Sequence, residues 1–157
     1  MIDEKLIQNH YDMFASLLFY PNEETLGEVE SAQEFLDQKY PDAAEILREF
    51  TEFTKIIPLW KWEEIYTRTL DVQAITTLDV GYVLFGDDYK RGELLVNLSK
   101  EHTKAGNDCE TELADHLPNL LRLLNKVTDK DFKDDLIYLI IKPALKKIIA
   151  EFDSRNI

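Results

Sequence analysis

The chain has little of the chemistry on which many enzymes and secreted proteins depend. Cys109 is its single cysteine, so neither an internal disulfide nor a thiolate metal cluster can form. The glycines of GYVLFGDDYKRGE are spaced for neither a dinucleotide fingerprint nor a phosphate loop. No serine lies in a nucleophile elbow. These absences predict a protein that is not an enzyme, and no catalytic residue is assigned.

Long apolar segments are also missing. The start, MIDEKLIQNH, is acidic and lacks the basic and apolar regions of a secretory signal. Apolar runs such as residues 136–141 are far too short to span a bilayer. The simplest expectation is a cytoplasmic protein.

Basic residues are scarce, since 18 lysines and arginines stand against 31 aspartates and glutamates, which leaves a formal net charge of −13. Such a surface repels nucleic acids and anionic membranes, so neither is an expected partner. It attracts a basic partner, such as a peptide that carries arginines. The charge could also serve solubility alone.

What the chain does have is apolar residues at helical spacing, separated by prolines and glycines. Thr77 is expected to cap one helix that Gly86 ends, and Gly106 to end the next. The helices are expected at Leu6–Leu18, Glu24–Gln38, Pro41–Ile57, Trp62–Asp71 and Leu78–Phe85, then from Asp87 or Asp88 to Ala105, at Leu117–Val127, and in a final pair, Leu136–Ile140 and Leu145–Phe152, separated or kinked at Pro143. We therefore expect one all-α domain over residues 1–157, a bundle of about eight helices.

One cluster along the chain could carry metal chemistry. It consists of His102, Asp108, Cys109, Asp115 and His116. The spacing matches no metal motif, so no metal ligand is assigned. His102 is expected to be a polar-edged core residue and Cys109 an ordinary loop thiol. A small metal-binding helical protein centred on His102, Asp115 and His116 remains an alternative.

The stretch Asp115-His116-Leu117-Pro118 opens a leucine-rich helix. Asp115 can accept a hydrogen bond from an N–H of the first turn, and Pro118 is tolerated in that turn. His116 is not explained by capping, because a helix N-terminus disfavours a charged imidazole. An aspartate beside a histidine could instead present an acceptor and a donor to a ligand.

Three ordered strings carry a resemblance to a known family. They are EIYTRTLDV (residues 64–72), TLDVGYVLFGDDYKRGELLVNL (77–98) and KAGNDCETELADHLPNLLRLL (104–124). Together they resemble the nitrate reductase delta-subunit family, the NarJ type of assembly chaperone, which belongs with the TorD and DmsD-like redox enzyme maturation chaperones. The strings cover the central half of the chain.

The resemblance implies an all-helical cytoplasmic chaperone that is not itself a catalyst and carries no cofactor of its own. Its partner would be the catalytic subunit of a molybdopterin oxidoreductase, most simply a respiratory nitrate reductase. Family members bind the N-terminal segment of that subunit, often a twin-arginine leader, while the molybdenum cofactor and an iron–sulfur cluster are inserted. A stable acidic subunit of a redox complex is a further alternative.

The resemblance also implies a peptide-binding site. Asp115 and His116 would be its leading contacts, and Glu112, Leu117 and Pro118 would shape that corner. Tyr66 and Asp71 would lie along the same peptide-binding groove, and Tyr82, Phe85 and Arg91 are weaker candidates. Tyr66 and Phe85 could equally be core residues, and Arg91 a surface partner of Asp87 or Asp88.

The chain departs from the family pattern at two places. Ala114 stands where the family often has proline. The sequence ends at Ile157, where many relatives continue into a further helix. A second copy of the chain could supply a missing wall of the groove, so a homodimer is a further expectation.

Overall fold

A computed structural model describes residues 4–71 and 75–154, and every regular element in these ranges is helical, which confirms the all-α prediction. With each π-helical segment counted as part of the α-helix that it continues, the described residues form eight helices. The elements are α1 (Glu4–Leu18), α2 (Thr25–Lys39), α3 (Pro41–Ile56), α4 (Leu59–Tyr66), η1 (Thr67–Asp71), α5 (Val80–Phe85), α6 (Tyr89–Ala105), α7 (Leu117–Lys126), α8 (Lys130–Asp135), η2 (Leu136–Ile141) and α9 (Lys142–Ser154).

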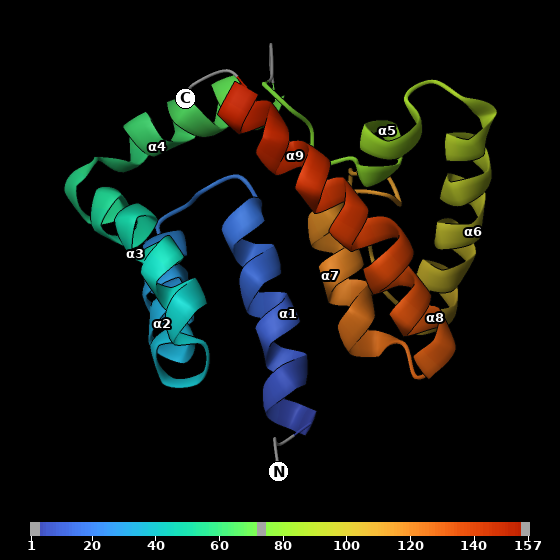
Figure 1. The fold of residues 1–157 in the computed structure, drawn as a ribbon, viewed down its shortest axis with the longest axis horizontal. Helices are drawn as coiled ribbons and strands as arrows, with labels where there is room; N and C mark the ends of the chain where they lie inside the picture. Colours follow the sequence, from blue (N-terminus) through green and yellow to red (C-terminus); the bar gives the residue numbers. More distant parts are fainter. Residues whose placement is uncertain (1–3, 72–74, 155–157) are drawn as a thin grey trace.

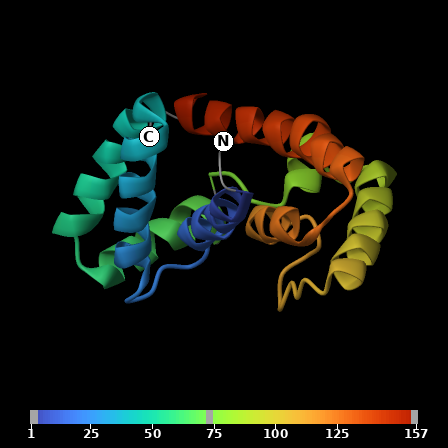
Figure 2. The ribbon, with the colours of Figure 1, turned by 90° about the horizontal axis from the view of Figure 1, so that it is seen from below.

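Helix α1 lies at the centre of the molecule, between the α2–α3 pair on one side and α7 on the other (Figure 1). Helix α9 crosses one face and packs on α5, and α6 lies at the end opposite α3 (Figures 1 and 2). In the described part of the chain, no helix combines the length and the apolar character that a bilayer span requires.

The core is centred on α7, whose leucine repeat produces a strongly one-sided helix. Leu117, Leu120 and Leu124 are buried as the repeat predicts, and Leu123 is buried with them. Their apolar contact with Leu78 and Leu98 joins α7 to the segment just before α5 and to the middle of α6. The entries to α5 and α7 are therefore anchored in a packed core.

Several helix ends follow the local signals in the sequence. The Asp88 side chain accepts the N–H of Lys90 at the start of α6, and Gly106 adopts the left-handed conformation that ends it (φ 69°). The α5 helix begins at Val80 and not at Leu78, because Leu78 is drawn into a backbone pairing with the loop before α7. The predicted Thr77 cap is thus replaced by Asp79 at the N-cap position.

The sequence predicts an apolar stripe along α3, formed by Ile46, Phe50, Phe53 and Ile57, and most of this stripe does not face the core. Ile46 is 81% exposed, and Phe50 and Phe53 are also exposed. The buried face carries Thr51 instead, whose hydroxyl donates to the Gln33 side chain of α2 at 2.9 Å. This hydrogen bond satisfies both polar groups between the helices, so a polar face is buried where the periodicity favoured an apolar one.

Of the two alternatives predicted at Pro143, a separation of the helices or a kink, the separation is wrong. Helix continues without a break through α8, η2 and α9. The change falls in η2, whose π-helical register immediately precedes Pro143. Prolines and π-helical turns are each known causes of helix bending, and in this helix they are adjacent.

Candidate functional site

The site is built where the entry to α5 meets the entry to α7. The backbone N–H of Val80 donates to the carbonyl of Asp115 (3.0 Å), and that of Leu117 donates to the carbonyl of Leu78 (2.8 Å). This short antiparallel bridge sets Asp79 directly opposite His116. Residues 75–86 carry β-branched and aromatic residues that would suit a strand, but the sequence shows no partner for a single short strand, so the segment was predicted to be helical and nothing joined it to the entry of α7.

Asp115 caps a helix, but not the one predicted. It is fully buried, and its Oδ2 accepts the backbone N–H of Gly81 in the first turn of α5 and the Nε–H of Arg91 in α6, each at 3.0 Å. Its own helix, α7, has His116 at the N-cap without a side-chain cap bond. The prediction that Asp115 contacts a peptide does not fit this placement, because no surface of it is exposed.

Leu117 and Pro118 are buried too, with Pro118 in the first turn of α7 as the sequence predicted. They support the site from the core and have no surface for a ligand. Arg91 forms an ion pair with Asp115 and lies 3.5 Å from Oδ2 of Asp79, so its main partners belong to the site and not to the surface pairing with Asp87 or Asp88 that was the alternative. Burial opposes its charge, but these carboxylates raise the pKa of Arg91.

A cavity of about 330 Å³ opens beside the bridge. Four of the predicted peptide-binding residues line it: Tyr66, Asp71, Glu112 and His116. They come from α4, η1 and the loop before α7, so the fold gathers residues that are far apart in the sequence. The other lining residues were not predicted as site residues: Phe19, Tyr20, Leu70, Thr77, Asp79, Cys109, Glu110 and Thr111.

Tyr66 connects this cavity to α1. Its hydroxyl donates to the carbonyl of Leu18 at 2.8 Å, and its ring meets that of Tyr20 edge to face. Burial, together with the carboxylates of Glu112 and Asp71, raises the pKa of Tyr66 to about 12. The tyrosine is therefore a neutral, fixed wall of the cavity.

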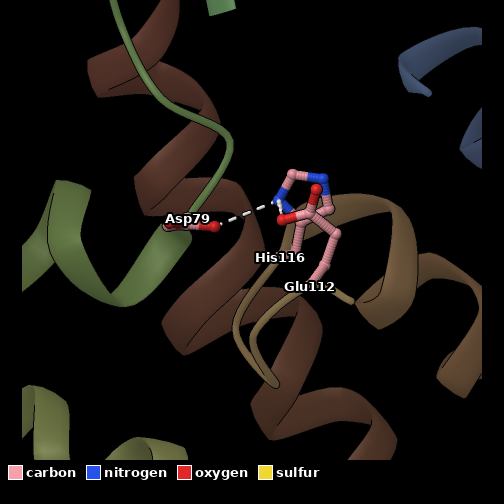
Figure 3. A group of neighbouring side chains, drawn as sticks. All are labelled: Asp79, Glu112 and His116. Carbon is pink, nitrogen blue, oxygen red and sulfur yellow. Dashed lines mark hydrogen bonds and ion pairs between the residues drawn. The ribbon is translucent and has the colours of Figure 1, made fainter. Parts of the chain in front are cut away.

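His116 is the residue that capping left unexplained, and its ring faces two carboxylates (Figure 3). Its Nδ1 lies 3.0 Å from Oδ1 of Asp79, which accepts a hydrogen bond from it, and 3.9 Å from Oε2 of Glu112. The ring of Phe19 is tilted against it with centroids 6.5 Å apart. Asp79 was missed as a site residue because Leu78–Phe85 was read as one helix, although it belongs to one of the strings that carry the resemblance.

Tyr82 and Phe85 lie on α5, away from this cavity. Tyr82 is exposed, stacks under the Arg91 guanidinium (5.4 Å) and lines a second cavity of about 640 Å³ between α5 and α9. Phe85 is half-buried, so its burial does not separate the two alternatives for it, a core residue or a peptide contact. Thr77 lines both cavities, so the two adjoin.

The metal-binding alternative centred on His102, Asp115 and His116 is not supported. His102 is buried, its Nε2–H donates to the carbonyl of Ala114 (2.9 Å), and its Nδ1 accepts the amide of Asn107 (3.0 Å). Burial lowers the pKa of His102, which keeps the ring neutral. Both ring nitrogens are engaged, so His102 is the polar core residue that the sequence predicted.

Cys109 lines the cavity beside the bridge, and its thiol is protonated. Burial and the neighbouring Asp108 raise its pKa, which agrees with its interpretation as an unreactive loop residue.

Comparison with protein-family models and with curated proteins finds no match to this chain.

Proposed function

We propose that the protein is a cytoplasmic assembly chaperone for a molybdoenzyme, and that it binds the N-terminal segment of the catalytic subunit. The observation that carries the proposal is the acidic, aromatic cavity in which Tyr66, Asp71, Glu112 and His116 come together. The resemblance of three sequence strings to the nitrate reductase delta-subunit family gives the class of partner. Respiratory nitrate reductase is the first candidate.

The cavity suits an arginine side chain. Carboxylates of Asp71, Asp79 and Glu112 can receive a guanidinium through charge-assisted hydrogen bonds. The ring of Tyr20 offers a face on which its plane can stack, whereas the ring of Phe19 already lies under the guanidinium of Arg122 (5.1 Å). Arginine is favoured over lysine at such a site because its planar fork matches a carboxylate with two hydrogen bonds.

The adjoining cavity suits the apolar part of a leader. Ile75, Val83 and Ala150 provide apolar lining beside Tyr82, and Thr77 links this space to the acidic cavity. A leader with arginines followed by apolar residues can therefore occupy both spaces in one orientation, as helical peptides do in apolar grooves. In this proposal the molybdenum cofactor is inserted into the partner, and the chaperone acts by holding it.

A binding measurement with a synthetic twin-arginine leader of a nitrate reductase catalytic subunit tests the proposal. Asp71→Asn and Glu112→Gln are each expected to weaken binding roughly tenfold, since a hydrogen bond to a charged group contributes about 1.5–3 kcal/mol. The matched control is Glu93→Gln, an exposed α6 residue with the same change of charge. A leader with lysines in place of both arginines should also bind more weakly.

Equal binding of the leader by all three variants would exclude the acidic cavity as its site. An affinity purification of the tagged protein from its native host, grown anaerobically, then identifies the partner. Recovery of a molybdopterin enzyme's catalytic subunit without its cofactor supports the chaperone proposal. Recovery of the mature enzyme would identify a stable acidic subunit instead, and recovery of neither would contradict both.

A further inference from the structure

Three potential metal ligands converge at the mouth of the acidic cavity. Asp79 comes from the N-cap of α5, His116 from the N-cap of α7 and Glu112 from the loop between α6 and α7. One carboxylate oxygen of each acid and Nδ1 of the imidazole all lie within 4.8 Å of one another. Figure 3 shows Asp79 and Glu112 turned toward the same edge of the imidazole ring.

These separations are close to those of a metal coordination shell. Zinc binds imidazole nitrogen and carboxylate oxygen at about 2.0–2.2 Å, which places neighbouring ligands of a tetrahedral ion roughly 3.3 Å apart. The Nδ1 of His116 lies 3.0 Å from Asp79 and 3.9 Å from Glu112. Glu112, the more distant of the two carboxylates, has a half-exposed side chain that can change rotamer.

The surroundings fix two of the three ligands in advance. One carboxylate oxygen of Asp79, Oδ2, lies 3.5 Å from Arg91. The other, Oδ1, faces the imidazole of His116. His116 is held by the backbone bridge and by the packing of Leu117 in the core. A site with preset ligands loses less entropy when an ion binds, and such supporting contacts raise metal affinity.

We infer that Asp79, Glu112 and His116 form a binding site for a first-row divalent transition-metal ion, for which Zn²⁺ is the suitable probe. One imidazole with two carboxylates favours such an ion over Mg²⁺ or Ca²⁺, which prefer all-oxygen shells. Binding requires the lone pair of Nδ1, so the neutral ring loses to solvent the Nδ1 proton that Asp79 otherwise accepts as a hydrogen bond, and it takes up one proton from solvent at Nε2. Three protein ligands leave a fourth position open to the cavity.

The site has one consequence for the chaperone proposal, and only this consequence rests on that proposal. Glu112 and Asp79 cannot hold an ion and a leader guanidinium at the same time. Zn²⁺ is therefore expected to compete with the leader for the cavity, so metal binding is tested in the absence of any peptide.

The test is calorimetric titration of the chelator-treated full chain with Zn²⁺, with Co²⁺ absorption as a second readout. We expect one equivalent to bind. Glu112→Gln should weaken the affinity at least tenfold, and His116→Asn should abolish binding. Glu110→Gln is the matched control, because Glu110 lies in the same loop and cavity but outside the ligand set.

Three results would overturn the inference: no stoichiometric binding, equal binding by Glu112→Gln and Glu110→Gln, or a thiolate charge-transfer band of Co²⁺ that disappears in Cys109→Ser. Circular dichroism shows whether each variant is folded. If His116→Asn does not fold, the comparison of Glu112→Gln with Glu110→Gln decides the result, since both side chains are exposed.

Discussion

Replacing Gly81 with alanine is expected to destabilise the protein, although alanine is the better helix former. A Cβ at Gly81 would lie 2.6 Å from Oδ2 of Asp115, 3.1 Å from Cγ of Arg91 and 3.2 Å from Cδ2 of Leu94. The carboxylate cannot turn aside without breaking its bonds to the Gly81 N–H and the Arg91 Nε–H, because Asp115 is fully buried. Gly81 is therefore the residue that lets Asp115 approach α5.

The magnitude follows from two opposing effects. An extra methyl group in a filled site costs about 1–3 kcal/mol, whereas alanine in place of glycine gains at most about 1 kcal/mol in a helix interior. Gly81 lies in the first turn of α5, where that gain is smaller. The expected net loss is ~1–2 kcal/mol, which lowers the urea midpoint by roughly 0.5–1 M for an m-value of about 2 kcal/mol/M.

Gly92→Ala is the matched control for this measurement. Gly92 is exposed within α6, and nothing lies within 4 Å of a Cβ placed there. This substitution should raise stability by up to about 1 kcal/mol, because no contact opposes the helix propensity of alanine. Urea unfolding followed by far-UV circular dichroism measures both variants. If Gly81→Ala shifts the midpoint in the same direction as Gly92→Ala, the proposed close approach of Asp115 is refuted.

Three further predictions concern the groups around the site. Asp115→Asn should cost ~1.5–3 kcal/mol of unfolding free energy, because the charged partner of Arg91 is lost; an unchanged urea midpoint would contradict this. Tyr66→Phe should cost ~1 kcal/mol, since its hydrogen bond to Leu18 disappears, and it should remove the tyrosine that ionises near pH 12 in an ultraviolet titration. The lowered pKa of His102 means that the unfolded chain binds its proton first, so stability should fall as the pH drops below about 6.5. An NMR titration in which His102 protonates at its ordinary pKa would refute that reasoning.

Local signals in the sequence determined the fold class and several helix ends. The helical spacing of apolar residues predicted the α-helices. The start of α6 was predicted at Asp87 or Asp88 and its end at Gly106, and the structure has Asp88 and Gly106 at these ends. Pro118 lies in the first turn of α7, as predicted. These signals can be read from sequence because capping and helical periodicity act over only a few residues.

The site itself was decided by tertiary structure. Asp115 and Gly81 are 34 residues apart in the sequence, and His116 and Asp79 are 37 apart. A carboxylate before a leucine repeat reads locally as the cap of the following helix, so the sequence placed Asp115 on α7. The bridge between the two helix entries instead directs it to α5 and leaves His116 to face the cavity.

The buried face of α3 was likewise beyond the sequence. Its apolar stripe is the stronger periodic signal, yet Thr51 faces α2 because Gln33 there offers its side-chain oxygen as an acceptor. Which face of a helix is buried depends on what the neighbouring helix presents, and periodicity within one segment carries no information about that neighbour. Composition and spacing thus determined that the chain is helical, and the packing of its helices decided which side chains form the core and which line the cavity.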